Sequence, residues 1–304
     1  METKNNWKAW LYLAPVLVLM LIFTVYPLIN TVAISFLKPS GYDYLANESF
    51  FHAVFKMGGG LSLDSYKYVF TFTPFIKSAL PNTLLIVFIT VPCSIALALL
   101  IAVGLNSIKF LHRIFQTIFF MPYVTNSIAV GMVFAVIFAS SNGLWNTIFG
   151  LGSTKWIDMG ADHAHAMFAL CVYIVWHALP YKILIFLSGL QGIDKQYYQA
   201  AKIDSSSKIR TFFRVTVPLL SPQIVYVLIT SMIGSFKEYS SIVALFNGKG
   251  TSQGSTNMYT IVYFIYDRIA GQPTIAAAAA VVLFVIILFF TFIQRKVLDR
   301  RVHY

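Results

Sequence analysis

Long uninterrupted apolar blocks constrain this chain more than any other feature of its sequence. Each block is near the ~20 residues that a helix needs to cross the hydrocarbon core of a bilayer. The apolar residues are not spaced as in amphipathic helices or half-buried strands. Only 11% of the residues are charged, whereas a soluble domain has about 25%. A water-soluble fold of this length could not bury so much apolar surface, so the sequence predicts an all-α polytopic membrane protein.

Six spanning helices are expected, within a single transmembrane domain that covers residues 1–304. Their predicted ranges are 10–36, 83–105, 114–138, 167–190, 217–246 and 275–293. The first block follows Lys4 and Lys8, as the core of a signal peptide would follow its basic residues. This block is longer than such a core and lacks a small-residue cleavage site, so we expect a retained first helix.

The basic residues predict which side of the membrane the termini face. With six spans, both termini lie on one side. Basic residues concentrate beside the spans on that side, at 4–8, 109–113, 195–214 and 295–301. Those on the opposite side sit mostly in longer loops, where the positive-inside rule gives charge less weight. Both termini are therefore expected in the cytoplasm, and the net charge of +11 is read as a topology signal and not as nucleic-acid binding.

Residues 191–216 are too polar to span the membrane and have the helix-start chemistry of two short helices. Asp194 can cap one helix, and one of the serines 205–207 can cap the second, because each has a short side-chain oxygen. Ala200 and Ala201 would let the first helix lie close against a groove on another protein. Apolar contacts to that protein could come from Tyr197, Tyr198 and Ile203. The segment is therefore predicted to be a cytoplasmic docking loop.

The stretch from Tyr198 to Asp204, with residues 212–222 after it, resembles the EAA loop of ABC-importer permeases, especially the sugar and glycerol-3-phosphate branch. In that family the loop forms coupling helices that sit in a cleft of an ATPase subunit. Further stretches similar to the same branch are Leu13-Ala14-Pro15, Tyr26-Pro27, Asn82-Thr83, Phe120-Met121-Pro122, Leu179-Pro180 and 187–190. The resemblance implies ATPase-coupling roles for Tyr198, Gln199, Ala200, Ala201, Asp204, Ser205 and Pro218.

Three positions depart from the family's loop. Gln199 stands where glutamate is usual, so an ion pair to an ATPase arginine becomes a weaker neutral hydrogen bond. Ser205 stands where glycine is usual, and serine is costlier than glycine in a left-handed turn. Either the turn is ordinary or this serine is strained. Ser206 replaces alanine and is nearly as small.

The same resemblance implies the assembly. The chain would have the type I importer permease fold and lie in the bacterial inner membrane as a multi-pass subunit. Its partners would be a second related permease subunit, two ATPase subunits and an extracellular solute-binding protein. The chain has no GxxxxGK[ST] loop, so ATP and Mg²⁺ are expected in the ATPase, and this subunit is expected to be non-catalytic, without a cofactor or metal.

Lys237 and Glu238 are the clearest candidates for the solute pathway, because a charge at membrane depth costs a few kcal/mol unless it faces protein or water. Tyr239, Ser240 and Ser241 add hydroxyls and an aromatic face beside them. The alternative is that the charged pair lies at the outer end of its block, where the two residues reach the interface or pair with each other. The sequence leaves both interpretations open.

Other polar residues of the spans could also line a pathway, namely Asn126, Thr125, Trp176, Tyr123, His177 and Tyr181. Packing between helices is at least as good an explanation for Trp176 and His177, and helix-to-helix hydrogen bonding for Asn126. Lys182 is expected to extend its stem to the cytoplasmic interface.

A sugar or short oligosaccharide is the expected solute, from the resemblance and from the hydroxyl-rich fifth span. Glycerol 3-phosphate is the alternative, although it would want more unpaired positive charge than Lys237 provides. A secondary transporter or channel, needing no ATPase, is a further alternative. An intramembrane enzyme is disfavoured, since the spans hold neither an HExxH motif nor a paired-aspartate arrangement.

Overall fold

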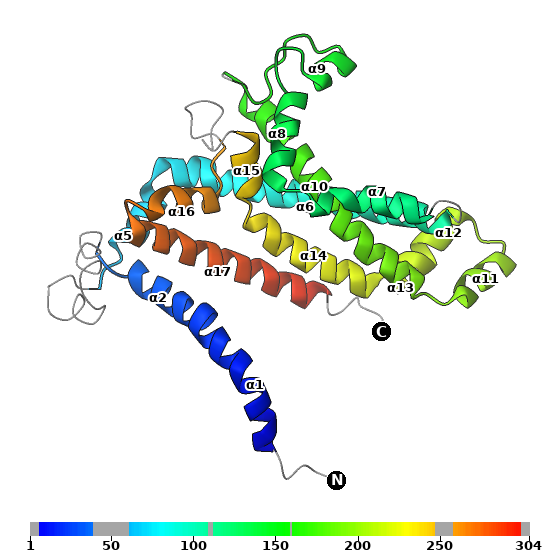
Figure 1. Ribbon diagram of the computed structural model, residues 1–304, viewed down its shortest axis with the longest axis horizontal. Coiled ribbons are helices and arrows are strands. Elements are labelled where there is room, and N and C mark those ends of the chain that lie inside the picture. Colours follow the sequence, from blue (N-terminus) through cyan, green and yellow to red (C-terminus); the bar gives the residue numbers. More distant parts are fainter. Residues whose placement is uncertain (1–5, 39–60, 109–111, 159, 247–257, 299–304) are drawn as a thin grey trace. The chain divides into compact units, whose positions relative to one another are not determined.

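The computed structural model describes residues 6–38, 61–108, 112–158, 160–246 and 258–298, which are mainly helical (Figure 1). The chain divides into two compact units. Unit 1 comprises Met1–Phe72 and Phe264–Val285, and unit 2 comprises Thr73–Tyr263 and Ile286–Tyr304. Of the basic residues used to predict orientation, six lie outside the described residues: Lys4, Lys56, Lys109, Lys249, Arg300 and Arg301. The orientation in the membrane stays a prediction.

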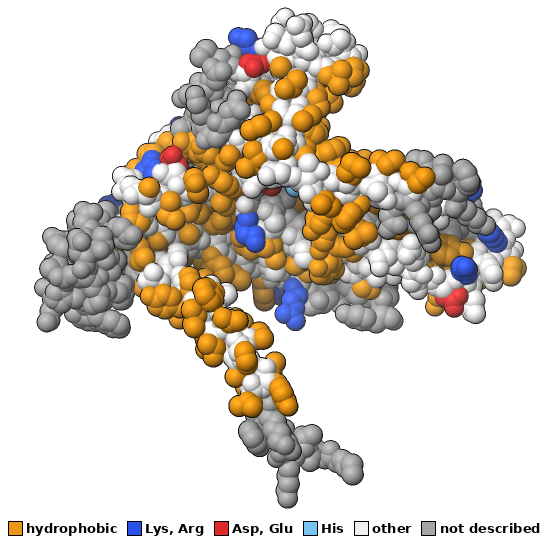
Figure 2. Space-filling view, in the orientation of Figure 1, with side chains coloured by type: hydrophobic (Ala, Val, Ile, Leu, Met, Phe, Trp, Pro, Cys, Tyr) orange, Lys and Arg blue, Asp and Glu red, His pale blue; other side chains and the backbone are white. Residues whose placement is uncertain are grey.

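Unit 1 begins with a long apolar helix. Its elements are α1 (Asn6–Met20), the π-helical turn η1 (Leu21–Val25), α2 (Tyr26–Ser35), α5 (Asp64–Thr71), the end of α16 (Ile261–Ile269) and the first half of α17 (Pro273–Leu298). The first three join into a candidate span, Trp10–Ser35, and 0% of its most apolar window is buried. Figure 2 shows hydrophobic side chains along the described length of α1 and α2. Such a helix needs lipid or another protein around it, because exposure of its apolar surface to water is unfavourable.

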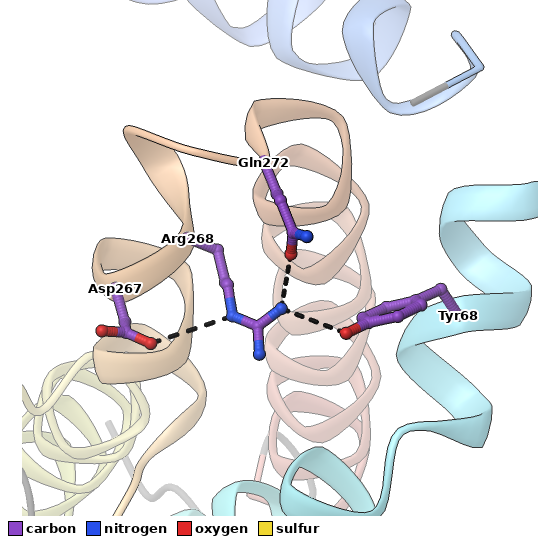
Figure 3. A network of polar contacts seen from close by, with 4 residues as sticks. All are labelled: Tyr68, Asp267, Arg268 and Gln272. Atoms are coloured by element: carbon purple, nitrogen blue, oxygen red, sulfur yellow. Dashed lines mark hydrogen bonds and ion pairs between the residues drawn. The ribbon is translucent and has the colours of Figure 1, made fainter. Parts of the chain in front are cut away.

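Arg268 ties α5 to the turn between α16 and α17 (Figure 3). Its Nη1 donates to the hydroxyl of Tyr68 at 3.2 Å and to Oε1 of Gln272 at 2.5 Å. The guanidinium carbon also lies 4.7 Å from the ring centroid of Phe72, within the range of a cation–π contact. Asp267 approaches the guanidinium from the other side, with Oδ2 3.8 Å from Nε. One side chain thus holds three segments of unit 1 together.

Unit 2 is built around two long helices that pack along each other. Its elements are η3 (Phe75–Ala79), α6 (Leu80–Ser107), α7 (His112–Val124), α8 (Ser127–Ile137), α9 (Leu144–Phe149), α10 (His163–Gln191), α11 (Lys195–Ile203), α12 (Lys208–Thr211), η4 (Phe212–Thr216), α13 (Val217–Leu219), α14 (Ser221–Phe236) and α15 (Ser240–Leu245). The α6 and α10 helices have the most extensive mutual contact, and α14 packs against both. Ala98 and Ala102 on α6 are fully buried with Phe186 of α10, so small residues on one helix admit a large ring from the other.

Four described helices are long and apolar enough to cross a membrane: Trp10–Ser35, Phe75–Ser107, His163–Gln191 and Pro273–Val297. Up to six spans result if each of two bent helix pairs counts as one. These pairs are Thr117–Val124 with Ser127–Ile137, bent by 106°, and Lys208–Leu219 with Ser221–Phe236, bent by 69°. The number of spans therefore stays a prediction.

Two of the predicted spans are broken where the sequence suggested continuous helices. In 114–138 the break falls at Asn126, whose side chain accepts a hydrogen bond from the Ile128 amide and so starts a new helix. In 217–246 one break lies at Leu220 and another at residues 237–239. The sequence is apolar on both sides of each break, which is why block length alone did not reveal them.

Candidate functional site

The polar segment between α10 and α14 forms the two short helices that its capping residues predict. Oδ1 of Asp194 accepts from the amide of Gln196 at 2.9 Å and caps α11. Oγ of Ser207 accepts from the amide of Arg210 at 3.3 Å and caps α12. Both caps are confirmed, and Ser207 is the member of the serine run that starts the second helix. We call residues 192–216 the coupling segment.

Ser205 ends α11 in a left-handed conformation, with φ of 51°. Its amide donates to the carbonyl of Lys202 at 3.0 Å, and the Ser206 amide donates to the carbonyl of Ala201 at 2.9 Å. These two bonds define a Schellman motif, whose left-handed residue is usually glycine because a Cβ crowds the backbone there. The left-handed conformation costs a non-glycine residue about 1–2 kcal/mol. Of the two alternatives, the strained serine is the one that the structure shows.

The face of α11 that carries the alanines is open. Gln199 and Ala200 are exposed, Asp204 is exposed at the helix end, and Ala201 is half-buried. Figure 2 shows charged side chains gathered around α11. These residues form a small-residue surface with a polar border, although contact with an ATPase there stays a prediction.

Tyr198 faces the other way and joins α11 to the chain before α14. It is half-buried, and its hydroxyl lies 3.3 Å from Oγ1 of the buried Thr216. Pro218, in α13, is also half-buried. Tyr198 and Pro218 therefore support the coupling segment from within the chain, whereas Gln199 and Ala200 remain on its surface.

The coupling segment rests on a close contact between α10 and α14. A Cβ placed on Gly189 would lie 2.8 Å from Cδ2 of Leu220 and 2.9 Å from Cγ of Gln223, so no larger residue fits without movement. Leu187, Leu190 and Leu220 are buried in the same cluster. The two helices that flank the coupling segment are therefore tightly packed at this point.

A cavity of about 330 Å³ opens in unit 2, mainly between α10 and the α14–α15 region. This volume lies within the range of small-molecule sites. The lining residues are Tyr123, Ile174, His177, Ala178, Tyr181, Lys182, Thr230, Ser231, Gly234, Ser235, Glu238 and Ser241. Six of these twelve residues carry a hydroxyl group, and the lining also contains one ammonium group, one carboxylate and one imidazole.

The residues predicted from the fifth span separate in space. Glu238 and Ser241 line the cavity, and Oε1 of Glu238 accepts from the Ser241 amide at 3.0 Å. Lys237 and Ser240 are exposed and do not line it. Tyr239 packs against the core with its ring centroid 5.8 Å from that of Tyr263. Among the described residues, no ion pair joins Lys237 to Glu238, because the chain turns between α14 and α15 at this point.

The candidates outside the fifth span also divide. Tyr123, His177 and Tyr181 line the cavity, as the sequence allowed. Asn126 and Trp176 do not. The structure gives each a packing or capping contact instead: Asn126 caps α8, and the Trp176 ring lies 5.1 Å from that of Phe134.

Lys182 was expected at the cytoplasmic interface, and that prediction is wrong. The residue is only 5% exposed, lines the cavity, and donates from Nζ to Oγ of Ser94 on α6. A signal for this placement exists in the sequence. His177, Tyr181 and Lys182 follow Ile174 at spacings of three, seven and eight residues, which puts them on one face of a helix.

Comparison with known proteins gives a consistent family. The profile described as "Binding-protein-dependent transport system inner membrane component" matches residues 94–304. A probable ABC transporter permease protein of Mycoplasma genitalium is 30% identical over 90% of this chain and 79% of its own length. The arabinooligosaccharides transport system permease protein AraP of Bacillus subtilis is 32% identical over 85% of this chain and 77% of its own. The sn-glycerol-3-phosphate transport system permease protein UgpA of Pectobacterium atrosepticum is 24% identical over 99% of this chain and 97% of its own.

Solved structures share the fold. A chain from a bacterial ABC transporter involved in the import of the acidic polysaccharide alginate aligns with a TM-score of 0.78 at 20% identity, over 98% of this chain and 96% of that one. A second structure of an alginate ABC transporter, in complex with an alginate pentasaccharide-bound periplasmic protein, aligns with a TM-score of 0.76. The importer-permease fold expected from the coupling-segment motif is thus confirmed. The chain belongs to the family of binding-protein-dependent transport system inner membrane components.

Proposed function

We propose that this chain is the permease subunit of an ATP-driven importer and passes a sugar or short oligosaccharide through the cavity of unit 2. The observation that carries the proposal is the coupling segment itself. Its capped helices present an exposed small-residue face, and the same segment is packed onto the two helices that supply most of the cavity wall. Relatives named for arabinooligosaccharide and glycerol-3-phosphate transport support the class of solute.

The connection from segment to cavity is short. The α10 helix ends at Gln191, α11 begins at Lys195, and the chain returns through α12, η4 and α13 to α14 at Ser221. Movement of the coupling segment therefore changes the position of α14 relative to α10. Because α14 and the chain after it carry Thr230, Ser235 and Glu238, that movement reshapes the cavity.

An ATPase that binds the exposed face of α11 would supply the movement, with ATP and Mg²⁺ held in that subunit. A second related permease subunit would complete the enclosure of the pathway. An extracellular solute-binding protein would deliver the solute, and the periplasmic protein present in the alginate transporter structure supports this part of the proposal. The alternative solute, glycerol 3-phosphate, keeps the same assembly.

Ala200→Arg tests the coupling role. The new side chain would remove the close approach that the exposed alanine allows, and loss of a central interface contact of about 2 kcal/mol or more lowers affinity more than tenfold. We expect the variant to reach the membrane but to lose ATPase co-purification and ATP-dependent uptake. Ala164→Arg, at an exposed alanine in the first turn of α10, is the matched control and should retain both.

Unchanged co-purification and uptake in Ala200→Arg would contradict the proposal. A secondary transporter or channel gives a different result again. It would move solute in liposomes that contain this chain without an ATPase, and the Ala200 substitution would leave that activity unaltered.

A further inference from the structure

Lys182 places a cationic group inside unit 2 with most of its hydrogen-bonding capacity unused. Its Nζ donates to Oγ of Ser94, and that hydroxyl in turn donates to the backbone carbonyl of Thr90 at 2.5 Å. The Ser94 hydroxyl therefore uses its proton in a hydrogen bond within α6, and it acts toward Lys182 only as an acceptor. An ammonium group has three donors, and Ser94 is the one acceptor that it meets among the described residues.

The positive charge of Lys182 also lacks a nearby counter-charge. Among the described residues, no carboxylate oxygen lies within the 4.0 Å of an ion pair to Lys182. Glu238 lines the same cavity, but its Oε1 is held by the Ser241 amide at the start of α15. A buried charge without a partner is costly, and an ionisable residue inside a membrane bundle usually marks a substrate or ion pathway.

The remainder of the cavity suits the uncharged part of a sugar. Tyr123 and Tyr181 stack with ring centroids 5.8 Å apart and form an aromatic wall. Thr230, Ser231 and Ser235 supply hydroxyls from α14. Glu238 can accept hydrogen bonds from sugar hydroxyls with the oxygen that Ser241 does not occupy. One region of the lining thus offers hydrogen-bonding groups, and Lys182 adds a positive charge to the same cavity.

We propose that Lys182 is a specificity-determining residue that binds the carboxylate or phosphate of an anionic sugar or polyol during its passage. The inference rests on the proposed function and narrows its substrate class. A neutral sugar could accept hydrogen bonds from the ammonium group but would leave its charge uncompensated. An anionic oxygen group supplies both the hydrogen-bond acceptor and the counter-charge. The resulting charge-assisted hydrogen bonds are about twice as strong as neutral ones.

The test uses the complete importer, with its partner permease, ATPases and binding protein, in proteoliposomes loaded with ATP. The probes are a uronate-containing disaccharide, glycerol 3-phosphate, and a neutral disaccharide with the same linkage. The first two distinguish carboxylate from phosphate as the anionic group. Variants are Lys182→Gln, which removes the charge, and Lys182→Arg, which keeps it. Lys155→Gln, at an exposed lysine outside the cavity, is the matched control.

We expect the wild-type importer to take up at least one anionic probe. Lys182→Gln should lower that uptake about tenfold, as for loss of one charge-assisted hydrogen bond, and should lower uptake of the neutral probe by a clearly smaller factor if it is a substrate. Lys182→Arg should restore anionic uptake, and Lys155→Gln should behave as wild type. Co-purification of the subunits establishes that each variant assembles.

Two results would overturn the inference while the proposed function stands. One is ATP-dependent uptake of the neutral probe alone by the wild type. The other is an equal loss of neutral and anionic uptake in Lys182→Gln, which would make the Lys182–Ser94 contact purely structural. Absence of ATP-dependent uptake for all probes in an assembled importer would instead refute both proposals.

Discussion

Ser205→Gly should stabilise the end of α11, although most substitutions in a folded chain destabilise it. Serine at φ of 51° carries about 1–2 kcal/mol of left-handed strain, and glycine carries none. Glycine is also more flexible in the unfolded chain, which offsets about 0.5–1 kcal/mol of the gain. The net stabilisation expected for the Schellman motif is therefore about 0.5–1 kcal/mol. No contact seen in the structure has to change.

Hydrogen exchange measures this effect where it arises. The amides of Ser205 and Ser206 donate the two bonds of the motif, so their exchange reports its opening. We expect Ser205→Gly to slow exchange at the Ser206 amide about two- to fivefold, the factor that corresponds to the net energy. Ser207→Gly is the matched control. That residue has φ of −63° and caps α12, so glycine relieves no strain there and loses a few tenths of a kcal/mol of capping.

Exchange at the Ser206 amide that is equal or faster in Ser205→Gly would refute the strain argument. Ser205→Ala separates the contributions further. Alanine keeps the Cβ and removes only the hydroxyl, so it should give no protection. A gain with alanine would assign the effect to the serine hydroxyl and not to the backbone conformation.

Three further substitutions test packing and side-chain contacts. Gly131→Ala should destabilise the chain by about 1–3 kcal/mol in thermal unfolding, because the new Cβ would lie 2.2 Å from Cβ of Ala244; Gly104→Ala, with nothing within 4 Å, should instead stabilise it by about 0.5–1 kcal/mol, and the same sign for both would count against the packing argument. Arg268→Lys should lower stability by about 1–2 kcal/mol, since lysine keeps the charge but loses the pair of hydrogen bonds to Tyr68 and Gln272 and the flat stacking surface. Equal melting temperatures for wild type and Arg268→Lys would show that charge alone matters there.

Local chemistry in the coupling segment could be read from the sequence. Asp194 and the serine run predict helix starts, because the hydrogen bond from a backbone amide to a short side-chain oxygen is local and does not depend on the rest of the fold. The choice of Ser207 over its neighbours, and the left-handed conformation of Ser205, depend on where α11 ends. Helix ends are the least certain part of a sequence-based prediction.

The cavity could be predicted less well, for a physical reason. An apolar block predicts a spanning helix, but it does not predict the direction in which a given side chain on that helix points. Lys182 could reach the interface along its stem or turn inward to Ser94, and both arrangements give its ammonium group a hydrogen-bond acceptor. Only the packing of α6 against α10 decides between them. Lys237 shows the converse case, since a break in the helix removed it from the cavity that its neighbour Glu238 lines.

The bond between Lys182 and Ser94 has a consequence for how the cavity opens. It links the two most extensively packed helices at a buried point, so α6 supports α10, which carries part of the cavity lining. The α14–α15 side of the cavity contains a candidate hinge, because residues 237–239 interrupt the helix and can absorb a change in backbone angles. Alternating access in this subunit would then move the α14–α15 side of the cavity, which carries Glu238, relative to an α10 side that is held by α6.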